Sequence, residues 1–537
     1  MATSGSTTPP PTTPPPTTEP QRKAALAADA LAAESVDVAL LDDVDKLKPH
    51  ALGLLGVLFL ALAAAAPMSA MLGNVPIAVG LGNGTAAPGG FILAAVLLFL
   101  FSVGYVAMAR RFSTAGGFYG YISHGLGRPL GMAAGWGGMA AYSVFEAGEW
   151  GIFAYFTRST FAQFLGIHLS WPVYAFAGLI LVGILTYFDV KLSARVLGVA
   201  LVCEVVLLLV MDIFVLAKGG GPSGISFAPL NPASALVGAG IKVAVPGVGI
   251  FFALWSWVGF EATANYAEEA RNPRKMVPRA TYIAVISLGV LYTLTAWAAV
   301  LGHGLATAST DAATNPGTFF YTVTSSFVNP FAKDVMQWLI ITSTFACAMA
   351  FHAAATRYFY AMGREGILNR WLGKTHTRWQ SPYAGSFAQS GVAAILVGLF
   401  ILLWYVNKPT QNFADFQTAP YLELYGWLAI LGTFLVLVIM TFSGIATISY
   451  FGRPEHRQLE HWMKWLVAPA LGSLGMAYAV YLLWANISTL GGNIGIVTAI
   501  PWVGTAWLII GVGIALLVRA RDPEKYEVLG RMVSKGL

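Results

Sequence analysis

Long apolar stretches separated by short polar segments follow one another from about residue 50 to about residue 520. About 20 apolar residues in a helix are enough to cross a hydrocarbon core of ~30 Å. Twelve such stretches centre near residues 66, 100, 143, 180, 206, 253, 292, 348, 394, 436, 474 and 509. The pattern therefore predicts an all-α membrane protein with twelve transmembrane helices.

Two of these stretches, the first and the sixth, contain residues that disfavour a continuous helix. The sixth covers residues 243–265 and is interrupted around residues 255–259. The first covers residues 51–81 and contains three helix breakers, Pro67, Gly73 and Pro76. Irregular backbone at membrane depth persists only where protein or a water-filled cavity meets its free N–H and C=O groups. Paired broken helices are also the strongest sequence pointer to the central site of a secondary transporter.

Composition and charge support a membrane protein and predict its orientation. Of the 537 residues, 57% are hydrophobic and 10% are charged, whereas about a quarter are charged in soluble domains. With the N-terminus in the cytoplasm, 26 of the 31 Lys and Arg residues fall on the inner side. The five on the outer side are Arg158, Lys218, Lys242, Lys333 and Lys408. Because positive charge accumulates on the cytoplasmic side, we expect a multi-pass plasma-membrane protein with both termini in the cytoplasm. The net charge of +6 then reflects the basic residues that fix this orientation, and no nucleic-acid partner is expected.

The chain ends are expected to lie outside the bilayer. Residues 1–49 should form a disordered cytoplasmic tail, because the first 20 residues hold seven Pro and seven Thr. Residues 521–537 should form a cytoplasmic C-terminal tail. No basic region followed by an apolar stretch opens the chain, so no cleaved signal peptide is expected. Cys203 and Cys347 lie within spans, and no metal-ligand spacing, phosphate loop or nucleophile elbow occurs, so we expect no metal, cofactor or enzymatic activity.

Three polar motifs follow spans 2, 6 and 8 on the predicted cytoplasmic side. The first is Arg110-Arg-Phe-Ser-Thr-Ala-Gly-Gly-Phe-Tyr-Gly-Tyr-Ile. The second is Gly259-Phe-Glu, followed by Glu268-Glu-Ala-Arg-Asn-Pro-Arg-Lys. The third is Arg357-Tyr-Phe-Tyr-Ala-Met-Gly-Arg-Glu-Gly, followed by Ser381-Pro. In this order and spacing, the motifs resemble those of the amino acid–polyamine–organocation permease superfamily.

The resemblance covers residues 50–450 and implies a LeuT-like core that works by alternating access. Two inverted five-helix repeats, with helices 1 and 6 broken, would form that core, and spans 11 and 12, over residues 451–520, would be peripheral. The superfamily usually binds a substrate carboxylate through bare amides of a glycine-containing triplet at the first break. Here that triplet is Ser69, Ala70 and Met71, whose Cβ atoms crowd the approach that glycine permits. The sequence Pro67-Met68-Ser69 is similar instead to that of putrescine-type and ethanolamine-type permeases, which bind amines without a carboxylate.

Four carboxylates within spans are candidates for substrate or proton binding, because isolated charges at bilayer depth normally face a cavity or a partner. Glu146 and Glu149 share a face of span 3. The resemblance places Glu146 where related antiporters read the substrate side chain, and a carboxylate there would favour a cation. Glu204 stands where several proton-coupled relatives carry a lysine, and Glu261 follows the second break. For Glu149, Glu204 and Glu261, proton coupling and a structural hydrogen bond are both open.

The expected substrate-binding residues come from both breaks and from spans 3 and 8. They are Ser69, Ala70, Met71, Gly73, Glu146, Trp255, Ser256, Gly259 and Phe351. The resemblance matches Trp255 and Phe351 to pocket aromatics, which would hold an ammonium by a cation–π contact worth ~0.5 to 2 kcal/mol. His352, next to Phe351, either relays protons or packs as a satisfied histidine.

These features predict a secondary active transporter that imports a small amine, polyamine or amino acid, coupled to protons. Within transport, an amino acid exchanger is an alternative. A non-transporting receptor on a permease scaffold is an alternative of another class, and it would keep the pocket without the cytoplasmic gating motifs. Because all three motifs are present, transport is favoured over the receptor. The sequence does not specify an oligomeric state.

Overall fold

The computed structural model describes residues 47, 50–112, 116–188, 190–407, 415–457, 459–490 and 495–530. The expected N-terminal tail lies almost entirely outside these residues, as does the end of the C-terminal tail. The described part is built from helices, and its β-structure consists of isolated bridges. Ten helical segments in it are long and apolar enough to cross a membrane.

These ten segments are α2–α3–η1 (Leu54–Ala65, Pro67–Ile77, Ala78–Gly82), α4 (Ala87–Ala109), α8 (Val190–Ala217), α10–η3 (Pro246–Trp255, Phe260–Glu269), α11 (Pro273–His303), α14 (Pro330–Arg364), α15 (Tyr383–Asn407), η6–α16 (Pro420–Tyr425, Gly426–Gly452), η7–α17 (Met463–Val467, Ala468–Leu490) and α19 (Ile500–Arg521). Short elements connect them: α5 (Phe118–Leu126), η2 (Ala228–Leu230), α9 (Pro232–Ala235), α12 (Ala308–Thr314), η4 (Pro316–Thr318), α13 (Phe319–Phe327), η5 (Arg370–Gly373), α18 (Gly495–Thr498) and α20 (Pro523–Val528).

Two further helices occupy the places of the expected third and fourth spans. α6 (Arg128–Leu165) is 38 residues long, and its middle carries the polar side chains of Glu146 and Glu149. α7 (Trp171–Tyr187) is apolar but has only 17 residues. The structure thus supports ten of the twelve expected spans by length and apolarity together, and the number twelve stays a prediction.

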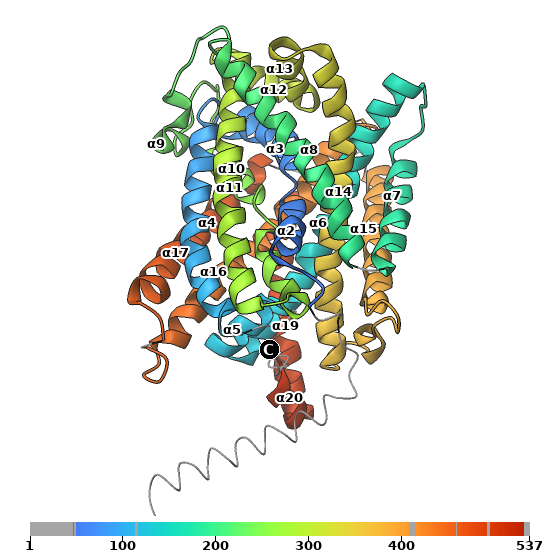
Figure 1. Cartoon of the computed structure of the whole chain (residues 1–537), viewed down its shortest axis with the longest axis vertical. Helices are drawn as coiled ribbons and strands as arrows, with labels where there is room; N and C mark the ends of the chain where they lie inside the picture. Colours follow the sequence, from blue (N-terminus) through green and yellow to red (C-terminus); the bar gives the residue numbers. More distant parts are fainter. Residues whose placement is uncertain are drawn as a thin grey trace, which may run out of the picture. The chain divides into compact units, whose positions relative to one another are not determined.

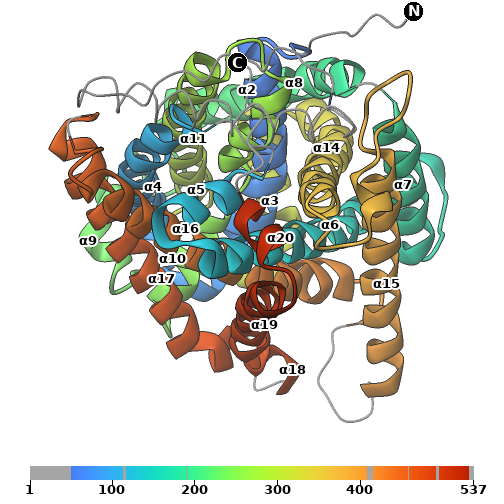
Figure 2. The ribbon, with the colours of Figure 1, turned by 90° about the horizontal axis from the view of Figure 1, so that it is seen from below.

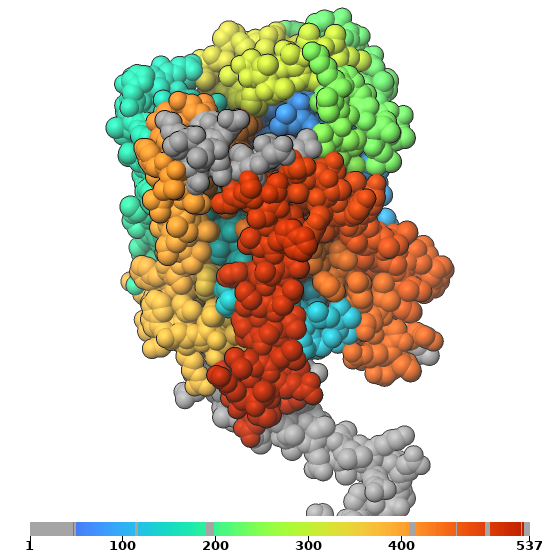
Figure 3. All heavy atoms as spheres, turned by 180° about the vertical axis from the view of Figure 1, so that it is seen from behind, coloured from blue at the N-terminus to red at the C-terminus, as the bar shows by residue number. Residues whose placement is uncertain are grey.

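Burial separates the central helices from those at the rim of the bundle. In the most apolar 18-residue stretch of each segment, 100% of α10–η3 and 72% of α2–α3–η1 are buried. In α15 and α19, 28% of that stretch is buried. The two interrupted segments lie in the middle of the bundle (Figure 1), and α15, α17 and α19 lie at its rim (Figure 2). From behind, α19 runs over the surface of the molecule (Figure 3). Apolar side chains on these rim helices are suited to lipid.

The first interruption lies between α2 and α3, at Ala66. Its φ of 37° is in the left-handed region, and Pro67 then begins α3, a position at which proline fits because the first helical N–H needs no partner. Contrary to expectation, α3 continues through Gly73 and Pro76. Pro76 cannot donate to the carbonyl four residues before it, that of Leu72, and the hydroxyl of Tyr421 donates there instead at 3.0 Å.

The second interruption lies between α10 and η3, where it was expected. Gly259 has a φ of 116°, and a Cβ at this position would lie 2.5 Å from the Cβ of Ala64. Only glycine therefore lets η3 pass this close to the end of α2. The amide freed by the turn is satisfied by Glu261, whose Oε2 accepts from the Gly259 N–H at 2.9 Å while Oε1 accepts from Tyr142 at 2.8 Å. The two interruptions are thus in contact at the centre of the molecule.

Candidate substrate site

A small pocket lies where the two interrupted segments meet, and every residue that lines it is buried. The lining comes from α2, α3, α6, α10, the turn after α10, α14 and η6: Ala64, Ala65, Ser69, Ala70, Asn74, Glu149, Trp255, Ser256, Val258, Cys347, Phe351 and Tyr425.

The structure brings together most, though not all, of the residues expected from the sequence. Ser69, Ala70, Trp255, Ser256 and Phe351 line the pocket, and so does the proton-coupling candidate Glu149. Four expected substrate residues are not among the lining residues: Met71, Gly73, Glu146 and Gly259. Gly73 and Gly259 shape the backbone next to the pocket, as their close contacts show.

Glu149 gives the pocket a carboxylate. It is 2% exposed, its Oε2 accepts a hydrogen bond from the Ser69 hydroxyl at 3.2 Å, and the Cys347 thiol lies beside it. A carboxylate so buried is stabilised most strongly by a cation in the same cavity. The arrangement therefore suits an ammonium group, and no metal-binding cluster of His, Cys, Asp or Glu occurs in the described part of the chain.

The free amides at the start of α3 are already paired inside the protein. The N–H of Ser69 donates to Ser343 Oγ at 3.1 Å, and the Ser343 hydroxyl donates to Glu204 Oε2 at 2.6 Å. The N–H of Met68 also faces the Glu204 carboxylate. Because the N-terminus of a helix carries partial positive charge, Glu204 occupies the place where an anionic group would be most stable. A substrate carboxylate would have to compete with it.

Aromatic side chains form one wall of the pocket. The rings of Trp255 and Phe351 are stacked, with centroids 6.0 Å apart, and Phe145 lies 4.3 Å from Trp255 between centroids. A chain of hydrogen bonds fixes the wall: Trp255 Nε1 donates to Tyr425 at 2.8 Å, and Tyr425 donates to Asn74 Oδ1 at 2.7 Å. An ammonium between this wall and Glu149 would gain a cation–π contact.

Tyr425 and Asn74 were not expected in the site. The polar Asn74 inside an apolar span was a usable signal, because a buried amide needs a partner. Tyr425 gave no signal. It enters the pocket from η6, a π-helical turn that changes which side chains of the segment face inward, and the apolar pattern does not reveal such a turn.

Glu146 lies in a different environment from Glu149. It is 0% exposed and faces α14 and α15, where it accepts hydrogen bonds from Gln389 Nε2 at 2.6 Å and from Trp150 Nε1 at 3.2 Å. The ring of His352 completes its surroundings, with Nδ1 3.0 Å from Glu146 Oε1. The two carboxylates therefore have different partners, and only Glu149 lines the pocket.

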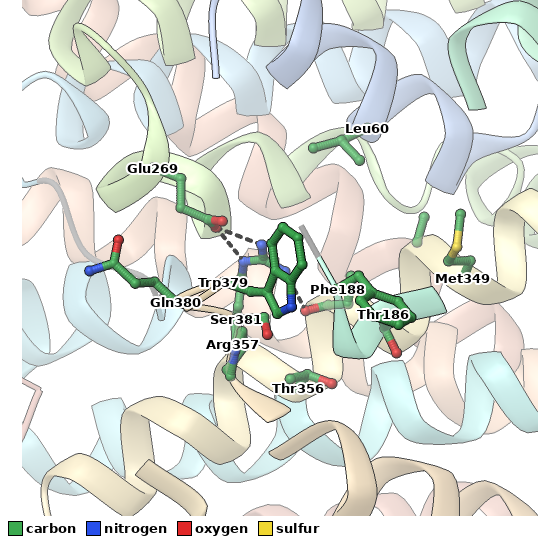
Figure 4. A pocket seen from close by; sticks show the side chains of 13 residues that line it. Leu60, Thr186, Phe188, Glu269, Met349, Thr356, Arg357, Trp379, Gln380 and Ser381 are labelled. Carbon is green, nitrogen blue, oxygen red and sulfur yellow. Dashed lines mark hydrogen bonds and ion pairs between the residues drawn. The ribbon is translucent and has the colours of Figure 1, made fainter. Parts of the chain in front are cut away.

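The end of the bundle that is predicted to be cytoplasmic is closed by an ion pair. Arg357 Nε donates to Glu269 Oε2 at 2.9 Å, and the guanidinium lies 4.2 Å from the ring centroid of Tyr266. The segment before α2 joins this closure, because the N–H of Leu52 donates to the carbonyl of Glu269 at 2.9 Å. A cavity lies beside the pair (Figure 4). The second cytoplasmic motif, with Glu269, and the third, with Arg357, thus meet in space.

Apolar helices long enough to cross a membrane, two of them interrupted beside a small buried pocket, indicate a multi-pass membrane protein. A family described as amino acid permease matches residues 52–517, and the chain belongs to that family. Its membership agrees with the superfamily that the three motifs resemble.

Several curated relatives are transporters. The low-affinity putrescine importer PlaP of Escherichia coli (strain K12) is 25% identical over 462 residues, which cover 83% of this chain and 91% of the importer. The branched-chain amino acid permease BcaP of Bacillus subtilis (strain 168) is 22% identical over 464 residues, 82% of this chain and 88% of that permease. The vacuolar cationic amino acid transporter 4 of Arabidopsis thaliana is 25% identical over 336 residues, 57% of this chain and 51% of that transporter.

Proposed function

We propose that the protein is a proton-coupled secondary active transporter that imports a small amine or polyamine by alternating access. In this proposal the helices form twelve spans in the plasma membrane, with both termini in the cytoplasm and two inverted five-helix repeats around the pocket. The putrescine importer among the relatives supports an amine substrate. An amino acid is the second candidate, which the branched-chain permease supports.

The observation that carries the amine proposal is the distribution of charge around Ser69. On one side, the Glu149 carboxylate lines the pocket, where a substrate cation would pair with it. On the other side, Ser343 and Glu204 take up the amides of α3 that would bind a substrate carboxylate. The pocket therefore offers a strong partner to an ammonium and a poor one to a carboxylate. A diamine such as putrescine fits this chemistry better than its amino acid parent ornithine.

Proton coupling is proposed to act through Glu149 and Glu204, because both are linked to Ser69. Glu149 accepts from the Ser69 hydroxyl, and Glu204 holds the Ser69 amide through Ser343. Protonation of either carboxyl changes a hydrogen bond at the first turn of α3, which is the half-helix that borders the pocket. Glu261 is the third candidate, and its two bonds at the second interruption favour a structural role.

Alternating access requires that each end of the pocket can open separately. The end with Arg357 is held by the ion pair to Glu269. The opposite end is held by backbone bonds, in which the N–H of Thr85 donates to the carbonyl of Ala239 at 2.8 Å and the N–H of Ala239 donates to Asn83 at 3.0 Å. The ion pair joins α14 to the second interrupted segment, and the backbone bonds join the residues after the first interrupted segment to those before the second. Movement of the second interrupted segment against these neighbours would therefore release them.

A thermal-shift assay with the purified full-length protein tests the substrate class. Putrescine, ornithine, ethanolamine and leucine are compared for thermal stabilisation, because a ligand that binds only the native state stabilises it by RT ln(1 + [L]/Kd). We expect putrescine to stabilise the protein at lower concentration than ornithine. Stabilisation by ornithine or leucine, with none by putrescine, would defeat the amine proposal in favour of an amino acid.

A further inference from the structure

A second buried polar cluster lies beside the pocket, between α6, α14 and α15. Its centre is the pair formed by Glu146 and His352, both 0% exposed. Neither side chain lines the substrate pocket. Their neighbours on the same helices do line it: Glu149 follows Glu146 on α6, and Phe351 precedes His352 on α14. The pair is therefore placed to respond to the pocket without touching the substrate.

The second ring nitrogen of His352 continues the chain of hydrogen bonds away from the pocket. Nε2 lies 2.8 Å from Ser386 Oγ on α15, and Ser386 Oγ lies 2.9 Å from Thr186 Oγ1 at the end of α7. Thr186 is only partly buried, and it lines the cavity beside Arg357 (Figure 4). Three side chains, those of His352, Ser386 and Thr186, thus connect a fully buried carboxylate with a cavity at the Arg357 end of the bundle.

The other groups that surround the pair are neutral or have partners of their own. Gln389 of α15 and Trp150 of α6 donate to Glu146 and do not titrate. Other carboxylates on α14 or the elements packed against it are bonded elsewhere. Among them, Glu149 is bonded to Ser69, Glu204 to Ser343, Glu261 to Tyr142, Glu268 to Arg364, Glu269 to Arg357 and Glu365 to Gly530. Within the described residues, Glu146 is therefore the titratable group that His352 faces.

We propose that Glu146 and His352 form a proton-binding site, and that Ser386 and Thr186 carry its proton to and from the cavity beside Arg357. This inference rests on the proposed proton coupling of transport. Histidine suits the task because one ring nitrogen can accept a proton while the other donates one. Hydroxyl groups suit the remaining positions because each is both donor and acceptor.

The transfer conserves protons at every step. Protonated Glu146 gives its proton to Nδ1 of His352, and the Nε2–H bond breaks as that proton passes to Ser386 Oγ. Ser386 gives its own hydroxyl proton to Thr186. The Thr186 hydroxyl donates to the carbonyl of Val182 at 2.8 Å, and it turns from that carbonyl to release one proton to water in the cavity. One proton leaves Glu146 and one reaches water. Each hydroxyl keeps one proton, and the imidazole changes tautomer.

Two measurements on the full-length protein test the proposal. The first is infrared difference spectroscopy during a pH titration of purified protein, which needs no substrate. We expect a carboxyl band that is lost in Glu146→Gln and shifted in His352→Gln. The second is uptake of labelled putrescine into liposomes under an inward proton gradient, compared with exchange of putrescine at equal pH on both sides.

Variants of the two hydroxyl residues test the proton path even if Glu146→Gln and His352→Gln fold poorly. Ser386→Ala and Thr186→Val should lose proton-driven uptake and keep exchange, because they interrupt the path and leave the pocket intact. Two variants serve as matched controls. His303→Gln removes a histidine whose Nδ1 lies 2.9 Å from Asp311 Oδ2, and Thr344→Val removes a buried hydroxyl that donates to the carbonyl of Ile340. Both controls should keep proton-driven uptake.

The outcomes separate this inference from the proposed function. Absence of a Glu146 carboxyl band at any pH overturns the proton-binding site, and so does wild-type proton-driven uptake in both Ser386→Ala and Thr186→Val. A titrating Glu146 band, with wild-type exchange but no response to the proton gradient, supports the proton site and refutes the coupling in the proposed function.

Discussion

Glu146 and Glu149 stand three residues apart on α6 and yet have different surroundings. Three residues turn an α-helix by about 300°, so the two side chains point about 60° apart. That angle directs Glu149 to Ser69 in the pocket and Glu146 to His352 beyond it. The sequence predicted that both are functional carboxylates. It placed Glu146 among the substrate-binding residues and Glu149 among the proton-coupling candidates, whereas Glu149 lines the pocket and Glu146 does not. Periodicity defines a shared face more coarsely than 60°, so it could not show which of the two side chains enters the pocket.

The first prediction separates the two carboxylates. Glu149→Gln should weaken the binding of putrescine by about 3 kcal/mol or more, because it removes a buried charge that pairs with the substrate. Binding of a neutral amino acid should change much less. Glu146→Gln should leave the affinity for putrescine close to that of the wild type. Calorimetric titration of the three proteins checks this, and equal losses in both variants would contradict the assignment.

At the scale of elements, the interruptions were partly predictable from residue type. Pro67 marks the start of α3, and Gly259 allows the turn before η3. Gly73 and Pro76 were misleading because tertiary contacts override local propensity: the Tyr421 hydroxyl replaces the donor that Pro76 lacks. The alternative donor comes from an element 345 residues later in the chain, and sequence patterns near Pro76 carry no trace of it.

The second prediction concerns the contact between the interrupted segments. Gly259→Ala should destabilise the protein by ~1–3 kcal/mol, because alanine is strained at a φ of 116° and its Cβ would meet Ala64 at 2.5 Å. Transport should fall with it. Gly391→Ala on α15 is the control, since a Cβ there has no neighbour within 4 Å. Thermal unfolding of both variants gives the comparison, and equal midpoints would show that the close approach is unimportant.

The third prediction concerns the C-terminal element α20, which docks near the predicted cytoplasmic end of the bundle. Glu365 accepts a hydrogen bond from the Gly530 N–H at 3.0 Å and another from the Tyr119 hydroxyl, and Arg128 pairs with Glu527. Burial raises the pKa of Glu365 from 4.5 to about 7. The native protein therefore binds more protons than the unfolded chain between these values, and its stability should fall as pH rises from about 4.5 to 7.

Glu365→Gln provides the comparison, because an amide does not titrate. The difference in unfolding temperature between wild type and variant should change steadily across that pH range and level off above it. A difference that is constant from pH 4.5 to 8 would show that the pKa of Glu365 is not raised in the native state.

At the scale of the whole molecule, the family and the helical architecture were predictable from three motifs and the apolar pattern. Those features are spread along the chain, and each stays recognisable in the sequence even where a helix is locally interrupted. The contact of the second motif with the third was not predictable in detail, because Arg357 and Glu269 are 88 residues apart and meet only through packing of α14 against η3. We propose that closure of one end of the bundle depends on this long-range pair.

The fourth prediction tests that closure. Glu269→Gln should favour the state open at the Arg357 end, because breaking a buried pair from one side costs ~3–5 kcal/mol in the closed state. A cysteine placed at Thr186 in the cavity beside the pair should then react faster with a polar thiol reagent. Glu268→Gln, which alters the neighbouring pair with Arg364, is the control. Unchanged reactivity in Glu269→Gln would mean that the pair does not hold this end closed.

Uptake of labelled putrescine into liposomes that contain the purified protein tests whether it is a proton-coupled amine importer. We expect accumulation that is driven by an inward proton gradient, is indifferent to sodium, and is lost in Glu149→Gln. Uptake that requires sodium and ignores the proton gradient, or that persists at the wild-type rate in Glu149→Gln, would contradict this proposal.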